Sequence, residues 1–140
     1  MSQLETQSSA VRSPLQSVAD VVARHFKEQF GRGPQRCRAF FAGRDAVVVI
    51  LDGTMSPAER RISDMGQGEL VRATRSALQS AVRADVVRAV EEVVGRPVLH
   101  AVDGLDVDGD VATQLFVLSD TAGAPPATHG DAVSAPGPAG

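Results

Sequence analysis

Two charged residues in the middle of the chain have side chains that could carry out chemistry. Glu59 could act as a general base, and Arg75 could hold the carboxylate or phosphate of a small substrate in a cleft beside it. However, Glu59 completes the capping box Ser56-Pro57-Ala58-Glu59, in which a glutamate accepts from the serine backbone N–H at a helix start. We therefore expect Glu59 to be structural. For Arg75 we favour a buried or interfacial ion pair with Glu59, Asp64 or an external carboxylate over a ligand contact or plain exposure.

Three alternating carboxylates near the C-terminal part of the chain suggest a calcium loop. They are Asp106, Asp108 and Asp110. An EF-hand loop needs glycine at its sixth position and glutamate at its twelfth, and this segment has neither in place. Asp108-Gly109 is instead the residue pair of a tight hairpin turn. We predict a turn and no metal site here.

A glycine-rich segment follows the first predicted helix and could bind an anion. Gly31 and Gly33 could present backbone N–H groups, with Arg32 and Arg36 as anion contacts. The segment lies at a helix C-terminus, however, where the helix dipole disfavours anions. In the structural interpretation, which we favour, a glycine caps the end of the helix and the turn after it ends at Pro34.

Histidine and cysteine do not form a metal or catalytic pattern. His25, His100 and His129 have no ligand-like spacing to one another or to Cys37, the one cysteine of the chain. A single cysteine excludes an intrachain disulfide and fits a reducing compartment. No nucleophile with an adjacent base is visible. We expect no enzymatic activity and no cofactor.

Length and charge restrict the class of protein further. The 140 residues are 43% hydrophobic and only 4% aromatic, which indicates one domain with an aliphatic core. The net charge of −3 is unevenly spread: residues 24–96 hold thirteen basic and nine acidic side chains, and residues 97–140 hold six acidic and no basic ones. The middle region could therefore attract an anionic partner.

Hydrophobic periodicity predicts two helix-and-hairpin units. Helices are expected over residues 14–30, 57–64 and 69–94, with a candidate kink or break at Ala84-Asp85, and strands over residues 36–42, 46–51, 98–102 and 111–118. Neither unit could bury its apolar face alone. We predict an α+β fold in which two α-β-β units, linked by helices, form a four-stranded, largely antiparallel sheet with helices packed on it.

The ends of the chain differ from this domain of residues 15–118. Residues 1–14 are polar and predicted to be a loose leader, and residues 119–140 are an Ala/Pro/Gly tail predicted to be disordered. Neither a signal peptide nor a transmembrane segment is predicted. We expect a cytoplasmic protein whose contact with membranes is peripheral.

Three motifs in a fixed order carry a resemblance to a known family. They are Gly31-Arg32-Gly33-Pro34, Met55-Ser56-Pro57-Ala58-Glu59, and Gly68-Glu69-Leu70-Val71 with Arg72 and Arg75 following. They resemble the motifs of the MpsC family, named as a component of a sodium-translocating, membrane-potential-generating system. The motif positions, whose role is unknown, are Gly31, Gly33, Pro34, Ser56, Glu59, Gly68 and Arg75. Met55-Ser56 stands where the family has Leu-Thr, and Gly66 adds a glycine before Gly68.

The resemblance implies a non-enzymatic accessory or regulatory module that binds other proteins near membrane transport proteins. Residues 46–51 are apolar on both faces of their predicted strand, which indicates either a central strand or a second layer from another subunit. The second possibility is the reason to expect a homo-oligomer. The alternative is a nucleic-acid-binding module, in which the arginines of the first hairpin contact phosphates and Phe40 stacks on a base. Those arginines are Arg32, Arg36, Arg38 and Arg44.

Overall fold

The computed structural model describes residues 13–120, and of the predicted leader and tail only residues 13, 14, 119 and 120 fall within that range. The rest of both predictions lies outside the described residues. The elements are α2 (Pro14–Phe30), β1 (Arg36–Phe41), β2 (Ala46–Asp52), α3 (Pro57–Asp64), α4 (Gly68–Val94), β3 (Val98–Asp106) and β4 (Val111–Leu118). None of the helices within residues 13–120 combines the length and apolar character that crossing a membrane requires.

Local sequence signals set the ends of α2 and its buried face. The Ser13 side chain accepts a hydrogen bond from the backbone N–H of Gln16, and Pro14 occupies the first turn. Gly31 ends the helix at φ +84°, a left-handed conformation that glycine adopts without steric cost. The side chains of Val18, Val22 and Phe26 are buried on one side of the helix.

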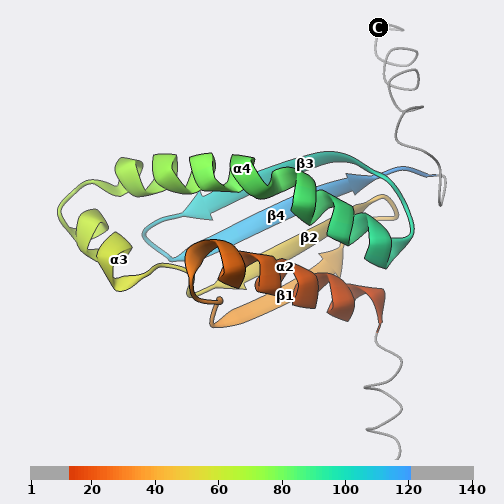
Figure 1. Cartoon of the computed structure of the whole chain (residues 1–140), viewed down its shortest axis with the longest axis horizontal. Helices are drawn as coiled ribbons and strands as arrows, with labels where there is room; N and C mark the ends of the chain where they lie inside the picture. The colour runs from red at the N-terminus through yellow and green to blue at the C-terminus, as the bar shows by residue number, and fades with distance from the viewer. Residues whose placement is uncertain (1–12, 121–140) are drawn as a thin grey trace, which may run out of the picture.

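The four strands form one antiparallel sheet in the order β1-β2-β4-β3. Each α-β-β unit contributes a hairpin, and the second strands of the two hairpins pair at the centre of the sheet. Helices α2 and α4 lie side by side on one face (Figure 1). The predicted α+β fold with two α-β-β units is therefore confirmed.

Between this face and the two helices lies an aliphatic core. It combines the buried side chains of α2 and α4 with alternate residues of the central strands, and its strand members are Val47, Val49, Leu51, Ala112, Phe116 and Leu118. The prediction that residues 46–51 form a central strand is correct. Their other side chains lie on the opposite face, where no helix of residues 13–120 packs. We call this second surface the open face.

The second hairpin and the long helix differ from their predictions. Strand β3 continues to Asp106, beyond the predicted end at residue 102, and the connection shortens to residues 107–110. The predicted turn at Asp108-Gly109 is present, because the Asp110 backbone N–H donates to the Val107 carbonyl at 3.3 Å across these two residues, and the residue with positive φ is Asp110, at +56°. The α4 helix runs without a break from Gly68 to Val94, through Ala84-Asp85.

Candidate functional site

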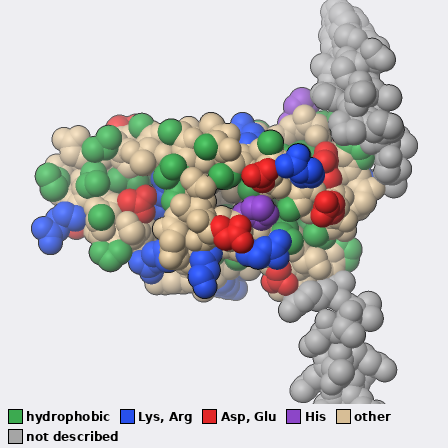
Figure 2. Space-filling model, viewed as in Figure 1, with side chains coloured by type: hydrophobic (Ala, Val, Ile, Leu, Met, Phe, Trp, Pro, Cys, Tyr) green, Lys and Arg blue, Asp and Glu red, His purple; other side chains and the backbone are tan. Residues whose placement is uncertain are grey.

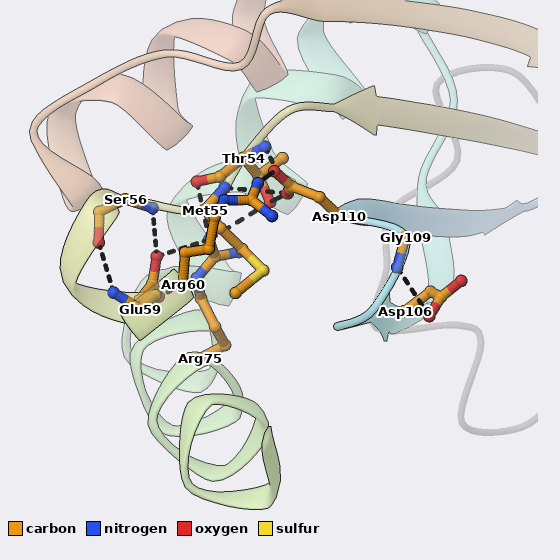
Figure 3. Close-up of polar contacts among 9 residues, drawn as sticks. All are labelled: Thr54, Met55, Ser56, Glu59, Arg60, Arg75, Asp106, Gly109 and Asp110. Carbon is orange, nitrogen blue, oxygen red and sulfur yellow. Dashed lines mark hydrogen bonds and ion pairs between the residues drawn. The ribbon is translucent and has the colours of Figure 1, made fainter. Parts of the chain in front are cut away.

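A group of polar side chains gathers at the end of the sheet where α3 begins (Figure 3). We call it the polar cluster, and it consists of Thr54, Ser56, Glu59, Arg60, Arg75 and Asp110. These residues come from the β2–α3 loop, from α3, from α4 and from the β3–β4 turn. The cluster thus joins both α-β-β units and the helices that link them.

The first part of the cluster is the capping box of α3. The Ser56 hydroxyl accepts from the Glu59 backbone N–H at 3.2 Å, and the Glu59 carboxylate accepts from the Ser56 backbone N–H at 2.8 Å. Pro57 occupies the first turn. The capping role predicted for Glu59 is confirmed.

Arg75 is almost fully buried, with 3% of its surface exposed. Its Nε and Nη2 donate to the two carboxylate oxygens of Glu59 at 2.7 and 3.0 Å, and Nη2 also donates to the Thr54 carbonyl at 2.8 Å. The guanidinium carbon lies 5.3 and 4.9 Å from the ring centroids of Phe26 and Phe30, within the range of a cation–π contact. The predicted buried ion pair is present, with Glu59 as its partner.

Asp110 forms the second half of the cluster. One carboxylate oxygen accepts from the backbone N–H groups of Thr54 and Met55 at 2.7 and 2.9 Å and from the Thr54 hydroxyl at 3.0 Å. The other accepts from Arg60 Nη2 at 2.8 Å. Asp110 therefore fastens the β3–β4 turn to the β2–α3 loop, and its role is that of an internal hydrogen-bond acceptor.

The bonding of the cluster limits what chemistry it can perform. Both oxygens of Glu59 accept from Arg75, and a carboxylate held by a guanidinium has low proton affinity. Burial would raise the pKa of Glu59, but the hydrogen bonds from Arg75 and from the Ser56 backbone N–H outweigh burial and hold the pKa below its ordinary value. Glu59 is consequently a poor general base at neutral pH.

A pocket of about 220 Å³ is lined in part by Arg75. Its lining includes Ser76 and Gln79 of α4 and Asp103 and Leu105 of β3. An enzyme that used Glu59 as a general base and Arg75 as a carboxylate or phosphate contact would need a cleft beside both side chains. The observed pocket lies between α4 and the sheet, and Glu59 does not line it.

Comparison with known proteins gives the chain a family. The family model for the Na⁺-translocating membrane potential-generating system (MpsC) matches residues 13–120. This chain belongs to the MpsC family. It is similar to the Uncharacterized protein YrhF of Bacillus subtilis (strain 168), with 29% identity over 101 residues that cover 71% of this chain and 82% of the relative. No solved structure matches it.

The MpsC motif positions meet at the end of the sheet that carries the polar cluster. Ser56, Glu59 and Arg75 are members of the cluster. Gly68 opens α4, where a Cβ atom on it would lie 3.6 Å from the Val107 side chain. The segment from Gly31 to Pro34 links the end of α2 to β1, and the Gln35 backbone N–H that follows it donates to the Asp52 carbonyl at the end of β2.

The anion contacts predicted for the glycine-rich segment remain a prediction. The Gly31 backbone N–H donates to the Lys27 carbonyl as a helix cap, so the structural role favoured for this glycine is present. Arg32 and Arg36 are both exposed beside it. Within residues 13–120, no group of three or more His, Cys, Asp and Glu side chains lies close enough to hold a metal ion.

Three members of the polar cluster were not predicted from the sequence. Thr54 lies in a loop without a motif, and Arg60 is one of two adjacent arginines on a short helix. Asp110 was considered as a calcium ligand and then as turn material, whereas its partners lie fifty or more residues earlier. The one local signal was its place in a hairpin turn, which indicates nothing about those distant partners.

The Glu59–Arg75 pair should give the fold a specific acid sensitivity. Because the folded state lowers the pKa of Glu59, the pair stabilises the protein above the ordinary pKa of 4.5 and loses this effect as the pH falls through the folded value. We expect Glu59→Gln to be less stable than wild type at pH 7 and to lose less stability between pH 7 and strongly acid conditions. Urea unfolding across that pH range measures the difference. The control is Glu69→Gln, whose side chain is 90% exposed; parallel pH profiles for Glu59→Gln and wild type would contradict the assignment.

The Cys37 thiol should be slow to react in the folded protein. Burial, with smaller contributions from the charges of Asp20 and Asp52, raises the pKa of Cys37 from 9.0 to about 11, and its Sγ lies 3.4 Å from the Ala19 carbonyl. Since the thiolate is the reactive form, alkylation by iodoacetamide at pH 8 should be about 100-fold slower than in urea-unfolded protein. Equal rates in the two states would show that the thiol is not shielded.

Proposed function

We propose that this chain is a non-enzymatic accessory or regulatory module that binds other proteins and works beside a membrane ion-transport system. The observation that carries the proposal is the match of the MpsC family over residues 13–120, which are all of the described residues. That family is described as part of a Na⁺-translocating, membrane potential-generating system. A cytoplasmic partner of such a system would attach to it peripherally, through its surface.

The chemistry of the polar cluster supports a binding role over a catalytic one. Its carboxylates and guanidinium groups are bonded to one another and to the backbone, so they fix the shape of this end of the molecule. Apolar side chains gather on the surface next to the cluster, at the end that carries α3 (Figure 2). Met65 is 67% exposed and Leu70 is 52% exposed there. A rigid end with exposed apolar side chains is suited to contact another protein.

The test is affinity purification of the tagged full chain from the membranes and cytosol of its native cell. The proposal predicts that a membrane transport protein co-purifies, and that Leu70→Asp and Met65→Asp reduce its recovery. The same cell without this chain should hold a smaller sodium-dependent membrane potential, measured with a potential-sensitive dye. Recovery of no transport protein, with an unchanged membrane potential, would contradict the proposal.

The arginines of the first hairpin do not support nucleic-acid binding. Arg38 is paired with Asp52 at 3.1 Å. Arg36 is the first of the six residues of β1 and Arg44 lies in the turn after its last, which puts them about 20 Å apart. They therefore do not form the contiguous patch that a phosphate backbone would require, and the geometry gives no reason to favour this alternative.

A further inference from the structure

The open face of the sheet is apolar at its centre. The strand register places Phe40, Val48, Leu115 and Val102 in one row across β1, β2, β4 and β3. Phe40 and Val102, at the two edges, are 46% and 54% exposed. Most other positions of the central strands on this face are also apolar, namely Ala46, Ile50, Val111 and Val117, and the exceptions are Thr113 and Asp52. A largely apolar face of this kind marks an interaction surface.

Opposite charges flank this apolar centre on the two outer strands. Arg36 and Arg38 project from β1, and Asp106 projects from β3. Arg36 and Asp106 belong to the same row, linked through Asp52 and Val111 by the register. Two strands separate them, so they lie about 14 Å apart within one molecule. The β1 edge of the open face is thus basic, and the β3 edge is acidic at the end of the sheet where Arg36 and Asp106 lie.

We propose that the open face is the interface of a homodimer, with a two-fold axis that lies between the two sheets and runs parallel to their strands. This inference deepens the proposed function, since it names a second copy of the chain as a protein partner. The axis places β1 of each copy over β3 of the other, which brings Arg36 to the partner's Asp106 and Phe40 to the partner's Val102. The two sheets then pack face to face as a sandwich. Because each sheet is twisted, the strands of one copy cross those of the other at about 30°.

Glycine at position 104 fits this arrangement. It shares a row with Arg38, Ile50 and Thr113, and a Cβ atom on it would lie 2.9 Å from the Thr113 hydroxyl oxygen. The open face is therefore flat at the point that the axis places opposite Arg38. The long guanidinium side chain of Arg38 has room there, close to the partner's Asp106.

The other axis that would join the two faces is perpendicular to the strands, and the charges disfavour it. It would place β1 on the partner's β1 and gather Arg36 and Arg38 of both copies along one stripe. Four arginines would then share only the two Asp52 carboxylates, and like charges at an interface cost binding free energy. The axis parallel to the strands separates the arginines and gives each Arg36 a carboxylate.

The size of the face reaches the lower limit for a specific protein interface. Four strands at about 4.8 Å spacing, with six to nine residues each, give a footprint of about 20 by 25 Å. Two such footprints bury about 1,000 Å² in total, which is where specific interfaces begin. Side-chain relief increases the accessible area above this flat estimate.

The first experiment measures self-association of the purified full chain by sedimentation equilibrium. Wild type should have twice the monomer mass of 14.6 kDa at micromolar concentration. Phe40→Asp and Val102→Asp should each weaken dimerisation at least about 10-fold, because each buries a charge in an apolar interface. Both side chains are exposed in the monomer, so the variants should fold. Leu70→Asp is the matched control, since it replaces an exposed apolar side chain outside the open face and should leave the dimer unchanged.

The second experiment tests the axis by charge exchange. Arg36→Glu alone and Asp106→Arg alone should each weaken the dimer, because each places like charges opposite one another at two symmetric positions. A mixture of the two variants should form a heterodimer in which both pairs are again opposite in charge. Contacts within one chain cannot produce this rescue, since the two residues are too far apart.

Each other outcome overturns the inference or one part of it. If the wild type is a monomer, the dimer inference is overturned entirely, and another occupant such as a different protein covers the open face. A dimer that Leu70→Asp disrupts and Phe40→Asp does not would place the interface elsewhere. A dimer without charge rescue overturns the axis. All of these measurements use purified protein, so their failure is distinct from failure to recover a transport protein from cells.

Discussion

Replacing Arg75 by alanine is expected to lower the free energy of unfolding by about 3–5 kcal/mol, the range found when one partner of a buried ion pair is removed. The substitution leaves Glu59 without the guanidinium that donates two hydrogen bonds to its carboxylate, and leaves the Thr54 carbonyl without its donor. It also removes the cation that lies against Phe26 and Phe30. Urea denaturation of the full chain, followed by far-UV circular dichroism at pH 7, measures the change.

The matched control for this prediction is Arg88→Ala on the same helix. Arg88 also pairs with a carboxylate, that of Asp85, but both side chains are more than 60% exposed. Its removal should change stability by no more than about 0.5 kcal/mol. If Arg75→Ala is as mild as the control, the cluster does not hold the fold together. Arg75 would then be better explained as a contact for a ligand that binds in the neighbouring pocket.

Most of the architecture could be predicted because its signals are local. Ser13 and Pro14 mark the start of α2, Gly31 marks its end, and the capping box marks the start of α3. Alternating apolar residues mark the strands, and the need of two half-buried hairpins for a common core implies one sheet. The strand order was not predictable, since the pairing of β2 with β4 joins residues far apart in the chain.

The end of β3 was predicted wrongly because its last residues have the composition of a turn. Asp103, Gly104 and Asp106 are all depleted in strands. In the folded chain, Asp103 forms an ion pair with Arg83 of α4 at 2.7 Å, and Leu105 packs against the core. Strand β3 therefore continues on contacts with another element, and such contacts override local propensity.

The polar cluster shows the same division between local and long-range information. The capping box was predictable from its motif, and an ion pair of Arg75 was expected, with Glu59 as one of three candidate partners. The bonds from Thr54 and Met55 to Asp110 were not, because they connect a loop to a turn in the other unit. The sequence contains no marker that joins these two segments.

The second large effect should follow replacement of Asp110 by alanine, at a cost of about 3 kcal/mol or more. The backbone N–H groups of Thr54 and Met55 would lose their shared acceptor in a buried environment, and each unsatisfied donor costs about 1–3 kcal/mol. Alanine must also adopt φ near +56°, a conformation that costs it roughly 1 kcal/mol. Asp110→Asn should be milder, since asparagine tolerates this conformation and keeps one acceptor oxygen. Chemical denaturation at pH 7 measures both.

Two further variants separate the lost hydrogen bonds from the backbone strain. Asp108→Ala changes an exposed residue of the same turn and should be close to wild type. Asp110→Gly removes the acceptor but adopts positive φ freely. If the loss of the hydrogen-bond acceptor is the larger effect, Asp110→Gly and Asp110→Ala should destabilise the fold to a similar extent. Asp110→Asn should then be clearly more stable than both. If glycine restores wild-type stability, the turn conformation is what matters, and the bonds to Thr54 and Met55 contribute little. The link between the two α-β-β units would then depend on the pairing of β2 with β4 and on Arg75.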